Sequence, residues 1–276
     1  MTEIPLQYLE SINTYEPVNF EGIMLYPIPV REYEAFGSAR PALDFLQQSL
    51  PVRYLSMPLL SAFFAMDVEN QKEGKPSDGL FLRSVLFLAL ALRHKPGLST
   101  EERVKDLFSG TFTSAEEPSV LKGIRFEQGG KEHVITPVLF QRMRPILAAQ
   151  NGIKLVSDDA SPELVESERD LAEQNGPELD VDLYSLISAI GTLTGTDEKE
   201  ILDWPILKMN RRREALERML NYLLCGISTA NGAQFKGGNP VPSPFFDRKS
   251  RETGALVDMA SFTGGKPISV SDKAPV

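Results

Sequence analysis

LFLRSVLFLALAL, residues 80–92, is the most apolar stretch of the chain. It is about one-half to two-thirds of the ~20 residues that a helix needs to cross a bilayer, and it contains Arg83 and Ser84. We therefore expect a helix that is buried in the core of a globular protein. A second, shorter helix is predicted after it, because Ser99 and Glu102 have the spacing of a capping box.

The segment before the apolar stretch contains a candidate strand and two candidate helices. Residues 22–33 (GIMLYPIPVREY) are rich in β-branched and aromatic side chains, but Pro27 and Pro29 each lack the N–H group that a sheet interior requires. Any strand here is therefore expected at the edge of a sheet. Residues 41–50 and 52–68 are predicted to form two short helices separated by a proline.

A β-hairpin followed by a helix is predicted after the apolar stretch. Residues 124–135 alternate in polarity around Gly129-Gly130, and two glycines can adopt the positive φ that a tight hairpin turn demands. Thr136 then has the character of a helix N-cap and is followed by a proline. The helix that begins here is expected to end at Asn151-Gly152.

Two apolar stripes are predicted in the C-terminal part of the chain. Residues 181–193 place apolar side chains at helical spacing, and a long helix after Trp204-Pro205 repeats this pattern. The two helices are expected to pack together through these stripes. The stripes consist of Leu183, Leu186, Ile187 and Ile190 in the first helix and Leu216, Met219, Leu220, Leu223, Leu224 and Ile227 in the second.

These patterns predict a mainly α fold with a small β-hairpin, of the α+β class, in which helical units precede an extended C-terminal tail rich in proline and glycine. The expected divisions are an N-terminal arm or edge strand (1–37), a helical unit with the hairpin (38–155), a charged connecting segment (156–180), a C-terminal helical unit (181–230) and the tail (231–276).

The composition argues against several classes of function. The net charge of −9 makes nucleic-acid binding by the whole chain unexpected, because an acidic protein must first concentrate its cations in one patch. Arg211, Arg212 and Arg213 point in different directions on a helix and are expected to face solvent. A single cysteine, Cys225, excludes an internal disulfide framework and a multi-cysteine metal site.

We expect neither an enzyme nor a cofactor or metal site. The chain has two histidines, His94 and His133, without a metal-ligand spacing, and these supply too little for a Ser/His/Asp system. Cys225 lies next to the second stripe, in the last turns of the long helix, and is interpreted as a small buried hydrophobe. The lysine and glycines of Phe235–Pro240 (FKGGNP) lack the spacing of a phosphate-binding loop and are interpreted as a turn or a docking segment.

Binding of another protein is the remaining class of function. Trp204 either anchors a partner or fills the core at the start of a helix, since aromatic side chains serve both purposes. The candidate partner-binding residues are Trp204, Leu216, Leu220, Phe235, Lys236, Phe245 and Phe246.

The start of the chain does not have the features of a secretory signal. The sequence begins Met-Thr-Glu-Ile-Pro, with no basic region ahead of an apolar core. We therefore expect residence in the cytoplasm and no association with membranes.

Four stretches together resemble a known family. They are Leu25–Phe36 (LYPIPVREYEAF), Ile135–Leu155 (ITPVLFQRMRPILAAQNGIKL), Val181–Trp204 with the amphipathic helix after it, and Phe235–Asp247 (FKGGNPVPSPFFD). Spread over most of the chain, they are similar to tail assembly chaperones of tailed bacteriophages and phage-like elements of Gram-positive hosts.

The resemblance implies a non-enzymatic, mostly helical factor in the cytoplasm of the bacterial host. Such a factor binds the tape measure protein and helps tail-tube subunits polymerise around it. The alternative is a structural tail or connector component that stays in the virion, with residues 231–276 as an arm along neighbouring subunits. The chain is also a candidate homo-oligomer, and its tail is either an extension of the chaperone or a docking arm.

Overall fold

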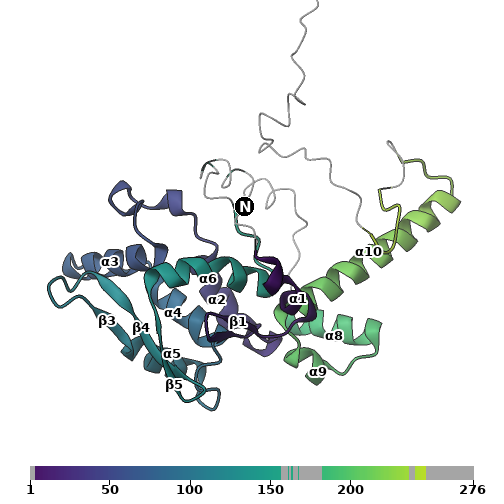
Figure 1. Cartoon of the computed structure of the whole chain (residues 1–276). Coiled ribbons are helices and arrows are strands. Elements are labelled where there is room, and N and C mark those ends of the chain that lie inside the picture. The colour runs from purple at the N-terminus through teal and green to yellow at the C-terminus, as the bar shows by residue number, and fades with distance from the viewer. Residues whose placement is uncertain are drawn as a thin grey trace, which may run out of the picture. The chain divides into compact units, whose positions relative to one another are not determined.

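The computed structural model describes residues 4–156, 161, 163, 167, 182–235 and 240–246. Residues 1–162 and 175–214 form one compact unit, and residues 163–174 and 215–276 form another. Most of the described secondary structure is helical (Figure 1). The strands form one two-stranded and one three-stranded antiparallel sheet. The prediction of a mainly α protein of the α+β class is confirmed.

Helix α4 (Leu80–Ala91) lies at the centre of the first unit, and the prediction of a buried core helix is confirmed. Nine of its residues are buried, among them Phe87 and Leu88. It packs against α2 (Tyr33–Leu43), α3 (Leu59–Lys72) and α5 (Thr100–Ser109). Most of the apolar side chains of α4 therefore meet a neighbouring helix, which explains why the stretch is apolar around nearly its whole circumference.

The segment before α4 differs from the two helices predicted over 41–50 and 52–68. Helix α2 begins at Tyr33 and ends at Leu43, with Pro41 in its last turn. Two short 3₁₀ helices follow, η2 (Gln47–Ser49) and η3 (Val52–Tyr54), before α3 begins. The predicted helix over 41–50 is therefore wrong, because Pro41 lies in the last turn of α2, where a proline is tolerated.

The N-terminal 37 residues contain more regular structure than an arm. Helix α1 (Leu6–Thr14) precedes a two-stranded sheet of β1 (Val18–Phe20) and β2 (Ile23–Leu25), and η1 (Val30–Glu32) leads into α2. In the sheet, Val18 pairs with Leu25 and Phe20 with Ile23. Strand β2 ends ahead of Pro27, as expected of an edge strand followed by a residue without an N–H group.

The predicted hairpin is confirmed, and a third strand that was not predicted extends it to a three-stranded sheet. Strands β4 (Leu121–Gln128) and β5 (Lys131–Ile135) pair in the register Gln128 with Lys131, and Gly129 and Gly130 in the turn have φ of 61° and 75°. Strand β3 (Thr111–Thr113) pairs with the other side of β4. Three residues are too few to show an alternating pattern, so β3 was not predicted.

Helix α6 (Pro137–Gln150) follows the hairpin and begins and ends as predicted. The Thr136 hydroxyl accepts a hydrogen bond from the Leu139 N–H, and Asn151 follows the last turn. At its C-terminal end the side chains of Gln150 and Asn151 are buried and bind distant backbone. The Gln150 amide donates to the Leu25 carbonyl (3.1 Å), and Asn151 Oδ1 accepts from the Ile28 N–H (2.9 Å).

The extended segment Leu25–Val30 forms hydrogen bonds with three separate parts of the chain. Besides its bond to Asn151, it donates from Tyr26 N–H to the Ala91 carbonyl at the end of α4 (2.7 Å). It also pairs with residues 204–206 around an antiparallel bridge between Pro29 and Pro205. Here the Val30 N–H donates to the Trp204 carbonyl (2.8 Å), and the Ile206 N–H donates to the Ile28 carbonyl (2.9 Å).

The three C-terminal helices of the structure are α8 (Leu183–Thr194), α9 (Glu198–Asp203) and α10 (Ile206–Ala230). Residues 182–214 belong to the same compact unit as residues 4–156. The contacts of the chain therefore do not divide at residue 181, because the Pro29–Pro205 bridge joins the two sides of that position. The connecting segment 156–180 lies almost entirely outside the described residues, as does the tail beyond residue 246.

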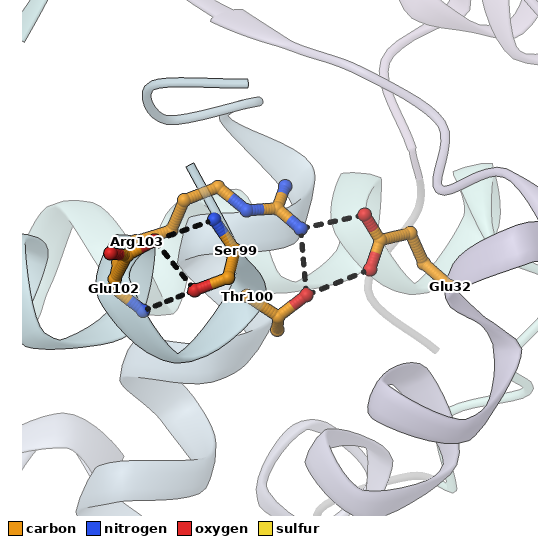
Figure 2. A network of polar contacts seen from close by, with 5 residues as sticks. All are labelled: Glu32, Ser99, Thr100, Glu102 and Arg103. Atoms are coloured by element: carbon orange, nitrogen blue, oxygen red, sulfur yellow. Dashed lines mark hydrogen bonds and ion pairs between the residues drawn. The ribbon is translucent and has the colours of Figure 1, made fainter. Parts of the chain in front are cut away.

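A polar network attaches the start of α5 to η1 (Figure 2). Ser99 and Glu102 form the predicted capping box, in which each side chain accepts from the backbone N–H of the other. Next to it, the buried Arg103 guanidinium donates to Glu32 Oε1 (2.6 Å) and to the Thr100 hydroxyl (2.9 Å). The Thr100 hydroxyl also donates to Glu32 Oε2 (3.2 Å), so the carboxylate holds both partners.

Substitution Asn151→Ala tests the attachment of the extended segment to α6. It removes the acceptor for the buried Ile28 N–H, so we expect the free energy of unfolding to fall by about 1–3 kcal/mol in urea denaturation. The exposed Asn221 of α10 is the matched control, and Asn221→Ala is expected to change this free energy by less than about 0.5 kcal/mol. Equal effects of the two substitutions would contradict the assignment.

Substitution Glu32→Ala tests the polar network. It leaves the buried Arg103 without its carboxylate, so we expect a loss of about 1.5–3 kcal/mol, the range for hydrogen bonds to charged groups. Glu32→Gln keeps one acceptor oxygen and is expected to lose less. Glu10→Ala, at an exposed position of α1, serves as the control in the same denaturation measurement.

Candidate functional site

The second half of α10 carries an exposed apolar surface, which we call the α10 stripe. Its members recur every three or four residues and thus share one face of the helix. Five of them are between 45% and 60% exposed, whereas Leu216 at the start is half-buried. The α10 stripe consists of Leu216, Met219, Leu220, Leu223, Leu224 and Ile227.

Burial differs between this stripe and the stripe of the preceding helix. Ile187 and Ile190 of α8 are buried, whereas the residues of the α10 stripe after Leu216 are exposed. Within the first unit, helix α8 packs on α9. On α10, burial ends at Met209, because three arginines follow and place charge where further core contacts would be needed.

The first of these arginines is used structurally. Arg211 donates to Asn13 Oδ1 (2.8 Å), and its guanidinium lies 5.5 Å from the centre of the Tyr15 ring. These contacts fasten the start of α10 to the end of α1. Arg212 is exposed. Arg213 is half-buried, so the three arginines differ in their surroundings and only part of the expectation that they face solvent is met.

Trp204 fills the core and is not part of an accessible surface. It is 7% exposed, and its indole N–H donates to Glu200 Oε1 (3.3 Å). The Lys208 ammonium lies 4.2 Å from the centre of its ring. Its backbone carbonyl also accepts a hydrogen bond from the Val30 N–H. Trp204 therefore fills the core at the start of a helix, and we remove it from the candidate partner-binding residues.

An exposed aromatic pair is presented by the described part of the tail. Phe245 and Phe246 are 77% and 76% exposed. Their N–H groups both donate to the Ser243 hydroxyl, at 3.1 and 3.2 Å, and the Phe245 carbonyl accepts from Arg218 of α10 (3.4 Å). Phe235 is half-buried, and Lys236 lies outside the described residues.

A groove of about 760 Å³ opens on the first unit, and sequence reasoning did not anticipate it. We call it the α3–α5 groove because α3, α4, α5 and the loop between α3 and α4 line it. Its aromatic side chains come from three helices: Phe64 from α3, Phe81 from α4 and Phe108 from α5. The centre of the Phe81 ring lies 5.0 Å from that of Phe64 and 6.0 Å from that of Phe108. Leu82 and Phe108 are exposed at its mouth.

Charged side chains surround this apolar groove. The Ser77 hydroxyl donates to Asp67 Oδ1 (2.6 Å). Burial raises the pKa of the Asp67 carboxyl, and the hydrogen bond from Ser77 opposes the rise. Lys75 and Lys105 form exposed ion pairs with acidic neighbours. An apolar floor with a polar rim is the arrangement found at sites that bind aromatic or aliphatic side chains.

The two histidines and the cysteine lie on different elements and have different surroundings. His94 is buried and its Nε2 contacts Asp106 Oδ2 (2.6 Å). Hydrogen bonds from Lys95 and then from His94 lower the pKa of the Asp106 carboxyl. His133 stacks on Phe126, and Cys225 is a half-buried free thiol on α10. Within the described ranges, no group of three or more His, Cys, Asp or Glu side chains is placed to hold a metal ion.

Comparison of the chain with protein-family models, curated proteins and solved structures found no match. In the part of the chain that the structure describes, no helix has both the length and the apolar character needed to cross a membrane.

The double substitution Leu223→Gln with Leu224→Gln tests whether the α10 stripe is exposed. Because both side chains are open to solvent and glutamine is also a good helix former, we expect the free energy of unfolding to change by less than about 0.5 kcal/mol. Ile190→Ala in the buried stripe of α8 is expected to cost about 2–5 kcal/mol. A loss above 2 kcal/mol in the double variant would show that the stripe is buried.

Proposed function

We propose that the chain is a non-enzymatic assembly factor that binds another polypeptide through the α10 stripe. The observation that carries this proposal is the exposure of five large apolar side chains on one face of a helix that continues to Ala230. Isolated apolar residues at a surface need no explanation, but a contiguous set of this size is typical of an interaction site.

The spacing of the stripe favours a helical partner. Leu216, Leu220, Leu223 and Ile227 follow one another at intervals of four, three and four residues. This is the spacing of the core positions in a coiled coil, where an apolar seam meets the seam of another helix. A partner with a long amphipathic helix therefore has the complementary surface.

The sequence resemblance indicates which partner to test. We propose the role of a phage tail assembly chaperone, acting in the cytoplasm of the bacterial host. The partner is the tape measure protein, whose apolar helical stripe the α10 stripe covers before tail-tube subunits polymerise around it.

A second candidate function is a structural tail or connector subunit that remains in the virion. The exposed Phe245–Phe246 pair favours it, because an aromatic pair on a C-terminal segment is suited to contact a neighbouring subunit. Mass spectrometry of purified particles separates the two functions. A chaperone is absent or scarce in the mature particle, and a structural subunit is present in stoichiometric amount.

Co-expression with the tape measure protein tests the chaperone role. We expect the native chain to keep that protein in the soluble fraction and to co-purify with it. Leu220→Glu with Leu223→Glu places two charges in the seam, and we expect it to abolish both effects. Both positions are exposed, so circular dichroism and thermal unfolding should match those of the native chain.

The matched control is Asn221→Glu with Thr229→Glu. It adds the same charge to the same helix at exposed positions away from the stripe, and it should retain the partner. Full activity of the folded Leu220→Glu, Leu223→Glu variant would remove the α10 stripe from the interface. Loss of activity in both double variants would indicate an effect of charge on the helix as a whole.

A further inference from the structure

We propose that the α10 stripe of one copy pairs with the α10 stripe of a second copy, as a parallel two-stranded coiled coil. The inference rests on the same exposed surface as the proposed function and adds a second occupant for it. Another copy of this chain covers the stripe when the helix of the partner protein is absent.

The stripe follows the heptad repeat of a coiled coil, whose seven positions are named a to g. Leu216 and Leu223 fall at d positions, and Leu220 and Ile227 fall at a positions. Leucine at d with a β-branched residue at a favours a parallel pair over larger bundles. Ala230, the last residue of α10, takes the next d position, so the seam extends over two heptads.

The folded chain holds α10 by residues that point away from this seam. Arg211 donates to Asn13 of α1, and Arg218 donates to the Phe245 carbonyl. Both arginines fall at f positions, on the side of the helix opposite the a and d positions. These contacts therefore leave the apolar face open, in agreement with the exposure of its side chains beyond Leu216.

The side chains that flank the seam match those of a second copy. In a parallel pair, the g residue of one helix lies beside the e residue of the following heptad in the other helix, and these contacts set partner choice and orientation. Arg212 at g therefore meets Glu217 at e, and Met219 at g meets Leu224 at e. Opposite charges face each other in the first contact, and two apolar side chains meet in the second. Each contact occurs twice, because the pair has two-fold symmetry.

An antiparallel pair lacks this match. There the e residues face e residues of the other helix, so aligning the leucine and isoleucine layers puts Glu217 beside Leu224 of the second copy. A carboxylate covered by an apolar side chain loses hydration without gaining a partner. The flanking residues therefore select the parallel arrangement.

The charge of the first unit does not oppose a parallel pair. Residues 4–156 and 182–214 contain 21 basic and 23 acidic side chains, a net charge of −2. Repulsion between two copies of this unit is therefore small. Because the seam is only two heptads long, the interface is small and weak. We expect monomers in dilute solution and dimers at high concentration.

Analytical ultracentrifugation of the full chain tests the association. We expect a monomer–dimer equilibrium with no larger species, because two identical faces close on each other. Leu220→Glu with Leu223→Glu should abolish the dimer, and the control Asn221→Glu with Thr229→Glu, outside the seam, should retain it. A native chain that is monomeric at all concentrations would overturn the proposal. A dimer that survives the charges in the seam would also overturn it.

Exchange of charges tests whether the flanking residues recognise a second copy. Arg212→Glu alone makes carboxylates face each other, and Glu217→Arg alone makes guanidinium groups face each other, so each should weaken the dimer by about tenfold or more. The two substitutions together should restore it, and an equimolar mixture of the single variants should form heterodimers. Glu214→Arg, at an exposed b position, should leave the association unchanged. A folded double variant that does not dimerise would overturn the pairing.

Disulfide cross-linking tests the direction of the two helices. In the Cys225→Ser chain, Ala230→Cys places two thiols at facing d positions of a parallel pair, and oxidation by air should link the copies. Thr229→Cys, at a c position, should not form this link. In an antiparallel pair, residue 230 lies beside residue 213 of the other helix. A dimeric Ala230→Cys chain that does not cross-link would therefore overturn the parallel arrangement.

Binding of the tape measure protein separates this inference from the proposed function. Glu217→Arg keeps every apolar side chain of the stripe, so it should weaken the dimer and still hold that protein in the soluble fraction. A monomeric native chain that binds the tape measure protein would overturn the dimer and leave the proposed function intact. A dimer with the expected charge dependence that does not bind that protein would support this inference and overturn the proposed function.

Discussion

The buried segment Leu25–Val30 is the constraint on which the first unit depends. The N–H and carbonyl groups of an extended segment in a core must have hydrogen-bond partners. Here each neighbouring element provides some of these partners. The end of α4 accepts from Tyr26, Asn151 after α6 accepts from Ile28, and residues 204–206 pair on both sides of Pro29. Because prolines occupy the positions whose N–H groups would point elsewhere, the segment can be enclosed without leaving donors unpaired.

This segment links the core to the proposed binding surface. The backbone bond from Ile206 to Ile28 fixes the first residue of α10, and Arg211 fastens the next turns to α1. Trp204 and Met209 supply the buried contacts, and the arginines mark their end. Helix α10 therefore begins among core contacts, whereas the apolar side chains of its second half are exposed. That combination suits a surface that recognises another helix.

Local signals in the sequence were sufficient for α4, the β4–β5 hairpin, the capping box of α5 and the start of α6. Each of these elements is determined by a few neighbouring residues. The apolar run predicts α4, Gly129-Gly130 the hairpin, Ser99 with Glu102 the capping box, and Thr136 the start of α6. The bridge between Pro29 and Pro205 depends on residues that are far apart in the chain, and the α3–α5 groove depends on phenylalanines from three helices. The α10 stripe was recognised as a pattern, but periodicity does not tell whether a stripe meets the core or another protein. Its packing against the stripe of residues 181–193 therefore stays a prediction, and its choice as a partner-binding surface is a proposal.

Hydrogen–deuterium exchange, measured on the isolated chain and on its complex with the tape measure protein, tests the central claim most directly. If the α10 stripe is the binding surface, amides of residues 216–227 exchange readily in the isolated chain, because few tertiary contacts protect them, and exchange much more slowly in the complex. Amides of α4 should be slow in both. Unchanged exchange over residues 216–227, with new protection confined to other described helices, would contradict the account.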